Sequence, residues 1–389
     1  MERNRNFMSI AILGYGVVGS GAYEILTKAG YKVSRVLDVR SYPELGNILT
    51  DDIEDILNDK EITVVAEAIG GNTFSYDFVS RALKAGKHVV SSNKHLICSY
   101  YKELHALAKE NGVTLRFTAS AGGGIPWLYN LKRGLLCDRI EKVMGIMNGT
   151  TNYILDAMIT DSRDFADALK EAQKLGYAEA NPSADIDGLD VARKTAISSS
   201  IAFDAVVSEE NVLTFSLRNI RKSDIEYIAK TCGKTVRYLG YGMRTENGVA
   251  AFVEPTLLPS EALEANVRTN NNMISLFGEY VGRLSFYGQG AGKYPTGNAL
   301  AQDIINILQG DTALFCAESD AVICNGEAKR AYFIRTNAAL PLDFAESSET
   351  VGETRYIFTE KISVAQMHET AKKILAEDSE SFFAGMDTE

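Results

Sequence analysis

The chain has few of the residues that build metal centres and disulfide frameworks. It contains five cysteines and four histidines in 389 residues. The cysteines are odd in number and lack the close pairs of zinc sites or disulfide scaffolds, so we expect reduced thiols. The histidines lack the i, i+4 spacing of a zinc hydrolase, so catalysis is expected to use other groups. These residues are Cys98, Cys137, Cys232, Cys316 and Cys324, and His88, His95, His105 and His368.

Long apolar runs and an excess of positive charge are also missing. The longest apolar runs are far shorter than the roughly 20 residues that cross a bilayer, so no membrane span is expected. Residues 1–8 lead directly into a strand-like segment without an apolar region or a cleavage site, which predicts a cytoplasmic protein without a secretion signal. The net charge of -11 and the scattered basic residues make nucleic acid a poor partner.

The first third of the chain alternates apolar, strand-like runs with amphipathic stretches. This alternation is typical of βαβ units, which build an open parallel sheet with its ligands beyond the carboxyl ends of the strands. Strands are expected at 10–13, 33–37, 63–68, 88–91 and 114–119, and helices at 19–29, 76–85 and 100–110.

A glycine-rich loop follows the first expected strand directly, and a helix-compatible stretch follows the loop. Its sequence is Gly14-Tyr15-Gly16-Val17-Val18-Gly19. In this context the first glycine permits a tight turn, the second lets backbone N–H groups approach a pyrophosphate, and the third lets the helix pack closely. The loop therefore predicts a Rossmann-type, doubly wound α/β domain that binds a dinucleotide. The alternative is a glycine-rich turn without a ligand.

Two neighbouring residues at the end of the second expected strand make opposite predictions about the cofactor. Asp38 has the spacing of an acid that bonds a ribose 2′-hydroxyl, which favours NAD. Arg40 is placed to neutralise the 2′-phosphate of NADP. The two residues leave the choice between NAD and NADP open, and the alternative for either side chain is a solvated surface group.

The rest of the chain lacks this regular alternation. Residues 132–285 combine longer helices with strand-like runs at 141–147 and 248–258, which indicates a second, α+β domain. A glycine-rich turn and an expected helix at 299–308 then follow. In the tail, we expect strands at 331–335, 356–361 and 381–385 and a helix at 363–375, a short α+β fragment.

Four segments, at 67–71, 82–94, 147–155 and 176–194, resemble homoserine dehydrogenase in the order of that family. The resemblance extends from about residue 9 to 310. It implies NAD(P)-dependent, reversible reduction of L-aspartate 4-semialdehyde to L-homoserine, in threonine and methionine biosynthesis, by a homodimer. It also implies a nucleotide-binding domain at 1–131 to which 286–335 return, a catalytic and dimerisation domain at 132–285, and a truncated regulatory-like tail at 336–389.

The resemblance assigns roles to particular residues. Glu179 and Asp190 would bind the amino and hydroxyl ends of the substrate, and Lys194 would donate the proton. A nearby ammonium stabilises the negative charge that hydride addition builds on the carbonyl oxygen. Lys94 is assigned as a second active-site cation that also meets the cofactor, and Asn93 as a contact to nicotinamide or ribose. The alternative for the acidic cluster is a solvated loop, with Asp190 as a helix cap and the neighbouring acids at 185 and 187 as surface groups.

A glycine turn at 118–126 resembles the family loop whose backbone carbonyls hold a monovalent cation such as sodium. The corresponding positions are Thr118, Ala121, Gly123 and Ile125. The family usually has glutamate where Thr118 stands, and a simple hinge is the alternative. Gly290, in a later glycine-rich segment, is expected to place backbone against the cofactor.

Two other functions are compatible with parts of this pattern. One is an oxidoreductase acting on a related amino-acid semialdehyde, and the other is a non-catalytic NAD(P)-binding sensor. The tail supplies only about half of the regulatory module of longer relatives, so threonine feedback is not predicted. Such a fragment is expected to cover a sheet edge or to assist dimerisation.

Overall fold

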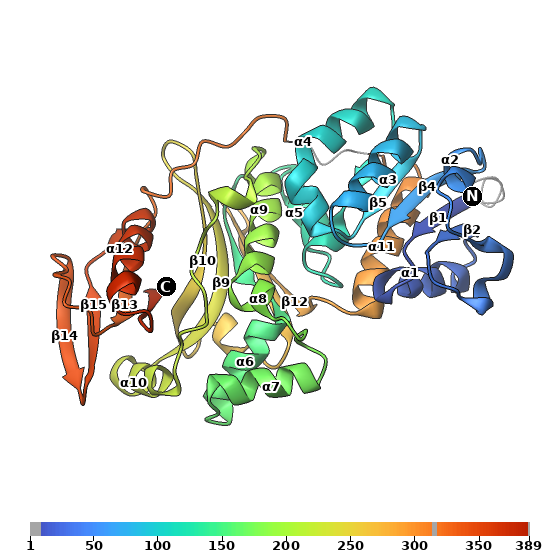
Figure 1. Ribbon diagram of the computed structural model, residues 1–389. Helices are drawn as coiled ribbons and strands as arrows, with labels where there is room; N and C mark the ends of the chain where they lie inside the picture. The colour runs from blue at the N-terminus through green and yellow to red at the C-terminus, as the bar shows by residue number, and fades with distance from the viewer. Residues whose placement is uncertain (1–8, 313–316, 388–389) are drawn as a thin grey trace. The chain divides into compact units, whose positions relative to one another are not determined.

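The computed structural model describes residues 9–312 and 317–387, which belong to two compact units (Figure 1). Unit 1 comprises the described residues of 9–137, 204–206 and 288–320, and unit 2 those of 138–203, 207–287 and 321–387. The expectations for residues 1–8 and for Cys316 lie outside the described residues. The other four cysteines form no disulfide among the described residues. None of the described helices is long and apolar enough to cross a membrane.

A six-stranded parallel sheet forms the centre of unit 1, in the order β3-β2-β1-β4-β5-β6. The first strand is buried along its whole length, as expected for a parallel strand covered on both faces. The strand order reverses between β1 and β4, so the loops after these two strands lie at the point where such sheets bind ligands. The strands are β1 (Ser9–Leu13), β2 (Val33–Leu37), β3 (Leu49–Thr50), β4 (Ile62–Glu67), β5 (His88–Ser91) and β6 (Leu115–Arg116).

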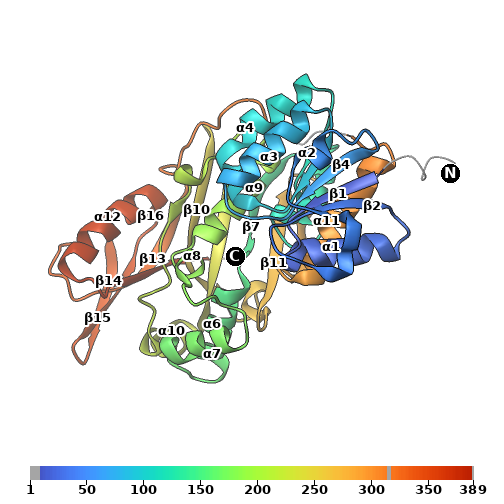
Figure 2. The same ribbon diagram turned by 45° about the vertical axis from the view of Figure 1, so that its right-hand side comes forward.

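Two helix pairs, α1 with α11 and α3 with α4, cover this sheet (Figure 2). The first pair packs very closely, because a Cβ on Gly21 would lie 2.3 Å from the carbonyl oxygen of Lys293. Helix α11 begins six residues before the expected 299, because a proline is tolerated in the first turn of a helix. The helices are α1 (Val17–Lys28), α2 (Glu54–Leu57), α3 (Thr73–Lys84), α4 (Lys94–Glu110), α5 (Trp127–Gly134) and α11 (Lys293–Leu308).

Unit 2 is built on a mixed, 11-stranded sheet in the order β12-β11-β7-β9-β10-β17-β13-β15-β14, with β16 beside β13 and β8 beside β10. Its strands are β7 (Ile140–Ile146), β8 (Leu213–Thr214), β9 (Lys234–Arg244), β10 (Val249–Pro259), β11 (Asn271–Gly278), β12 (Gly282–Gln289), β13 (Lys329–Arg335), β14 (Ala345–Val351), β15 (Thr354–Thr359), β16 (Ile362–Ser363) and β17 (Phe382–Met386). The long antiparallel pair β9 and β10 forms its middle.

A nearly buried helix, α9, packs on β7, β9 and β10. Two glycines of β9 make this approach possible: a Cβ on Gly240 would lie 2.1 Å from the Thr195 hydroxyl, and one on Gly242 2.0 Å from the Ser199 hydroxyl. The chain thus fixes α9, and the side chains it carries, against the sheet. The helices of unit 2 are α6 (Gly149–Thr160), α7 (Phe165–Lys174), α8 (Ser183–Ile186), α9 (Leu189–Phe203), α10 (Lys222–Cys232) and α12 (Val364–Glu377).

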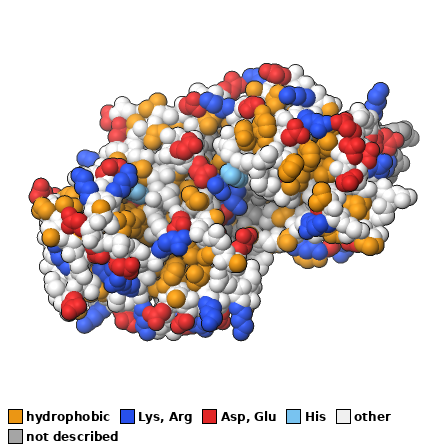
Figure 3. Space-filling model, viewed as in Figure 1, with side chains coloured by type: hydrophobic (Ala, Val, Ile, Leu, Met, Phe, Trp, Pro, Cys, Tyr) orange, Lys and Arg blue, Asp and Glu red, His pale blue; other side chains and the backbone are white. Residues whose placement is uncertain are grey.

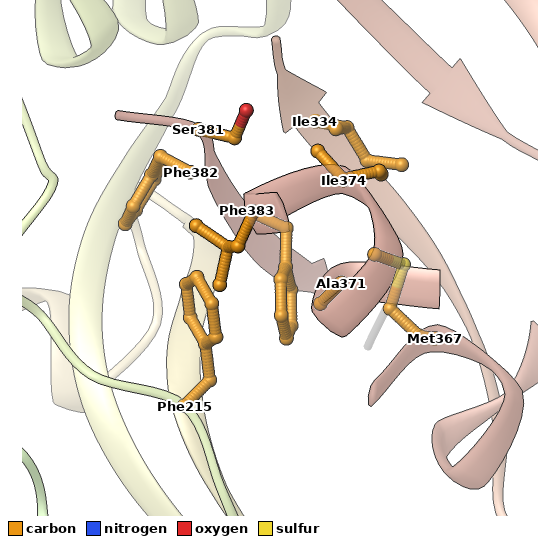
Figure 4. Close-up of a pocket in the computed structure, with 9 residues that line it drawn as sticks. Phe215, Ile334, Met367, Ala371, Ile374, Ser381, Phe382 and Phe383 are labelled. Atoms are coloured by element: carbon orange, nitrogen blue, oxygen red, sulfur yellow. The ribbon is translucent and has the colours of Figure 1, made fainter. Parts of the chain in front are cut away.

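The C-terminal segment is continuous with the sheet of unit 2. Strand β17 lies between β10, with which it is parallel, and β13, with which it is antiparallel. Side chains from β13, β17 and α12 meet Phe215 around a small apolar hollow, where the rings of Phe215 and Phe383 have centroids 3.8 Å apart (Figure 4). The tail strands and helix were expected, but β14 was not. All but one of its residues are exposed, so it lacks the apolar alternation that marks a strand.

Charged side chains of both signs are intermixed on the face shown in Figure 3, without an extended basic area. This distribution agrees with the scattered basic residues of the sequence.

Candidate active site

The glycine loop of unit 1 has the geometry of a phosphate cradle. Gly14 has φ of +91°, and a Cβ there would lie 2.8 Å from the Ala68 carbonyl oxygen. Around Gly16 the space is open, with Arg40 Nη2 the nearest atom to a Cβ, at 3.9 Å. No side chain caps the start of α1 at Gly16, so backbone N–H groups are left for a ligand. Val17 projects into solvent beside them, 66% exposed. The residues present therefore fit a dinucleotide.

Asp38 and Arg40, just after the end of β2, are joined by hydrogen bonds between their side chains. The Arg40 Nε and Nη2 atoms donate to the two carboxylate oxygens of Asp38 at 3.0 and 2.9 Å. The Tyr15 N–H donates to the same carboxylate at 2.8 Å. The Arg40 side chain, followed by the backbone hydrogen bonds, lowers the pKa of Asp38 to about 2. An ionised acid and an exposed guanidinium therefore stand together at the expected ribose position.

Glu67, the last residue of β4, binds the loops at the point where the strand order reverses. Its fully buried carboxylate accepts hydrogen bonds from the Ile69 N–H at 3.0 Å and from the Ser91 hydroxyl at 2.5 Å. Asn93 is also buried: its Nδ2 donates to the Gly71 carbonyl at 2.6 Å, and its Oδ1 caps α4. The side chain of Asn93 thus holds the loop, and it places Lys94 at the first turn of α4.

The expected cation turn is buried and wound through two positive-φ glycines, at 122 and 123. Gly290 packs directly on it, because a Cβ on Gly123 would lie 2.3 Å from the Gly290 carbonyl oxygen. Thr118 donates from its N–H and its hydroxyl to the buried carboxylate of Asp303, at 2.8 and 2.7 Å. Burial raises the pKa of Asp303 to about 6. The part of the chain that is described holds no cluster of three His, Cys, Asp or Glu suited to a metal, so a cation here would rely on backbone carbonyls.

In unit 2, Lys194 and Asp190 lie one turn apart on α9. The Lys194 Nζ donates to Asp190 Oδ2 and to the Met147 carbonyl oxygen, both at 2.7 Å. Both side chains are 9% exposed. The predicted i, i+4 arrangement of the two residues is confirmed. The contact of Lys194 with the Met147 carbonyl could not be predicted from their spacing along the helix. The contacts fix the ammonium group at one position above the end of β7.

Asn148 connects this pair to a second carboxylate. Its Nδ2 donates to Asp190 Oδ2 at 2.8 Å and to Asp185 Oδ1 at 2.7 Å, while its Oδ1 accepts from the Thr151 N–H and caps α6. Burial, followed by the charge of Asp190, raises the pKa of Asp185. The alternative of a solvated loop residue does not hold for Asp185, because α8 places its carboxylate in a buried position beside that of Asp190.

The two remaining acids of this segment behave differently. Asp187 faces Arg218, which donates from Nη2 at 2.7 Å and lowers the pKa of the carboxylate. Glu179 is exposed, and among the described residues no hydrogen bond or ion pair joins its carboxylate to the Lys194 cluster. The structure thus brings Asp190 and Lys194 together, adds Asp185 and Asn148, and leaves Glu179 at the surface of the same segment.

Sequence reasoning assigned no role to Asn148 or Glu67, although both lie in segments that carry the family resemblance. A usable signal was present for each: an asparagine just after an expected strand that can cap the next helix, and an acid at the end of a buried strand.

A doubly wound sheet with an uncapped glycine loop, together with a second unit that buries a lysine among carboxylates, defines the class of nicotinamide-dependent dehydrogenases. Comparison with known proteins narrows this class. Residues 14–118 match the NAD binding domain of homoserine dehydrogenase, and residues 126–305 match the homoserine dehydrogenase family itself.

Full-length relatives agree. The homoserine dehydrogenase of Bacillus subtilis is 38% identical over 315 residues, covering 77% of this chain and 72% of that protein. That of Corynebacterium glutamicum is 36% identical over 373 residues, 91% of this chain and 84% of that one. The crystal structure of a homoserine dehydrogenase from Thiobacillus denitrificans superposes with a TM-score of 0.87, at 32% identity and 98% coverage of both chains. The chain belongs to the homoserine dehydrogenase family, oxidoreductases that interconvert L-aspartate 4-semialdehyde and L-homoserine with NAD(P).

Proposed function

We propose that Lys194 is the group that exchanges the proton in this reaction. The observation that carries the proposal is the position of its ammonium group, held by Asp190 Oδ2 and the Met147 carbonyl in a buried site. When bound, the reduced nicotinamide supplies the hydride to the aldehyde carbon. Lys194 gives its proton to the carbonyl oxygen as negative charge develops there, and it takes the proton back from the alcohol in the oxidising direction.

The acids around Lys194 are proposed to hold the cationic end of the substrate. Asp190 and Asp185 present two carboxylates that share the Nδ2 group of Asn148, which keeps them at a fixed separation. Glu179, exposed in the loop before them, is proposed as a further substrate contact. Lys94, at the start of α4 in unit 1, is proposed as a second cation for the substrate carboxylate and the cofactor.

For the cofactor, we propose that Asp38 and Arg40 set the ratio of NAD to NADP use. The carboxylate favours a ribose 2′-hydroxyl and repels a 2′-phosphate, whereas the guanidinium attracts the phosphate. The pyrophosphate is proposed to lie over Gly14, Gly16 and Gly19, beside Val17 and Val18, with Asn93, Lys94 and Gly290 near the nicotinamide half.

A monovalent cation such as sodium is proposed to bind the carbonyls of Thr118, Ala121, Gly123 and Ile125. The buried carboxylate of Asp303 compensates for the missing glutamate, because it bonds Thr118 at the N–H and the hydroxyl. The cation would stabilise the turn on which Gly290 rests.

The protein is also proposed to be a cytoplasmic homodimer. Strand β12 is an outer strand of its sheet and exposes apolar side chains, with Leu284 41% and Tyr287 59% accessible. An exposed apolar edge strand is a surface that a second copy can cover. Light scattering should give twice the mass of the chain, and Leu284→Lys should shift it to the single-chain mass.

The proton role of Lys194 is tested by Lys194→Ala, with Lys174→Ala on α7 as the matched exposed control. We expect turnover of homoserine with NAD or NADP to fall roughly 10²- to 10⁴-fold in Lys194→Ala, as for loss of a general acid, with cofactor affinity unchanged. The control should retain both. An equal loss of cofactor binding, or wild-type turnover, would refute the assignment.

A further inference from the structure

A cleft of about 300 Å³ opens in unit 2 on the face of the sheet opposite α9. On β9, Gly240 and Gly242 face α9, so Tyr241 between them faces away, and Met144 of β7 pairs with it on the same side. Met144 and Phe277 form part of the apolar floor of this cleft. The cleft therefore lies outside the Lys194 site and is the size of a small-molecule pocket.

Cationic side chains dominate the lining. Five are basic and two are acidic, although the whole chain carries a net charge of -11. Glu264 is already paired with Arg283, and Asp387 with Arg330 at 2.8 Å. The basic residues are Lys142, Arg283, Lys329, Arg330 and Lys361. Both acids of the cleft are thus neutralised within the protein, and positive charge is left over.

Lys329 and Lys361 provide the uncompensated charge. Both are exposed, and no carboxylate of the described residues lies within ion-pair distance of either ammonium group. The antiparallel pairing of β16 with β13 makes them diagonal neighbours, because Lys329 is in register with Ser363, two residues after Lys361. Like charges that line the same cleft repel each other, and a bound counter-charge relieves this repulsion.

Ion pairs and ring contacts hold the cations at the base of the cleft. Arg330 is 8% exposed and is held by Glu254 Oε1 and Asp387 Oδ1, both at 2.8 Å, with its guanidinium over the ring of Tyr241. Lys142 Nζ lies 4.0 Å from the ring centre of Phe277. Fixed cations beside an apolar floor are the arrangement that recognises phosphate or carboxylate groups on a small organic body.

We propose that this cleft binds a small ligand that carries two or more negative charges, from phosphate or carboxylate groups, with Lys329 and Lys361 as its main contacts. The site is distinct from the dinucleotide loop and from the Lys194 cluster. Recognition depends on charge, so affinity falls as ionic strength rises.

Isothermal titration of the full chain with pyrophosphate and with citrate tests the proposal, with saturating NADH present so that the dinucleotide loop is occupied. The double variant Lys329→Gln/Lys361→Gln should bind roughly 10-fold or more weakly. The double control Lys170→Gln/Lys174→Gln, on exposed α7 positions, should bind as wild type. Binding of pyrophosphate alone would identify a phosphate site, and binding of citrate alone a carboxylate site. Absence of binding by both probes, or equal weakening in the control, would overturn the proposal.

Discussion

Asn148 offers a prediction that separates its catalytic effect from its structural one, because its two side-chain atoms have different tasks. The Oδ1 atom caps α6 through the Thr151 N–H, and the Nδ2 atom bridges Asp185 and Asp190. Asn148→Ser retains a hydroxyl that can cap the helix but is too short to bridge the carboxylates. Asn148→Ala loses both functions, so the pair of variants forms a matched comparison.

The magnitudes follow from these contacts. A hydrogen bond to a charged group contributes about 1.5–3 kcal/mol, so loss of the bond to Asp190 alone should lower kcat/KM roughly 10- to 150-fold in both variants. Loss of the cap should make the alanine variant about 1 kcal/mol less stable than the serine variant. The hydrogen bond from Asn148 lowers the pKa of Asp185, so its loss should raise that pKa in both variants. As the pH is lowered, the activity of both variants should therefore begin to fall at a higher pH than that of wild type.

Steady-state kinetics of homoserine oxidation between pH 5 and 9, with urea unfolding of the same samples, would measure these effects. Wild-type kcat/KM in Asn148→Ser would refute the bridging role. A loss of activity that merely follows stability, larger in the alanine than in the serine variant, would show that the cap alone matters.

Three other predictions concern the cofactor, the buried acid and the tail. Asp38→Asn should shift the ratio of kcat/KM values toward NADP, and Arg40→Ala toward NAD; a shift in the same direction in both would contradict the opposed roles. Asp303 has a folded pKa of about 6 against 3.8, so its contribution to stability is full below pH 3.8 and is lost as pH rises through 6. The free energy of unfolding of Asp303→Asn, relative to that of wild type, should therefore rise by about 3 kcal/mol between pH 4 and pH 8. A difference that stays constant over this range would disprove the raised pKa of Asp303. Deletion of residues 337–389 removes β17 from between β10 and β13, so circular dichroism should show loss of folded unit 2; a truncated protein with native stability would argue otherwise.

Local pattern was sufficient to predict much of unit 1. Strands such as β1 and β4 are mostly apolar, and the glycine loop has the strand before it and the helix after it that its function needs. These features are local in sequence, so they can be recognised without tertiary contacts. The expected strand at 114–119 was too long, because the chain leaves β6 at Arg116 and turns to place Thr118 on Asp303.

Features that depend on distant contacts could not be predicted in the same way. Nothing local in β17 indicates that it lies between β10 and β13, because strand order is decided by packing across the whole unit. The same holds for the site. The i, i+4 spacing predicted the contact between Asp190 and Lys194, but their contacts with Asn148 and with the Met147 carbonyl join residues that are more than about 40 positions apart in the sequence.

Chemical rescue of Lys194→Ala tests the central claim most directly. Homoserine oxidation by this variant would be followed through reduced-nicotinamide absorbance, with and without added methylamine, from pH 6 to 10. If Lys194 exchanges the proton, the amine should restore part of the lost rate, and the restored rate should rise with the fraction of neutral amine. A variant whose rate is indifferent to the amine and keeps the wild-type pH dependence would contradict the account.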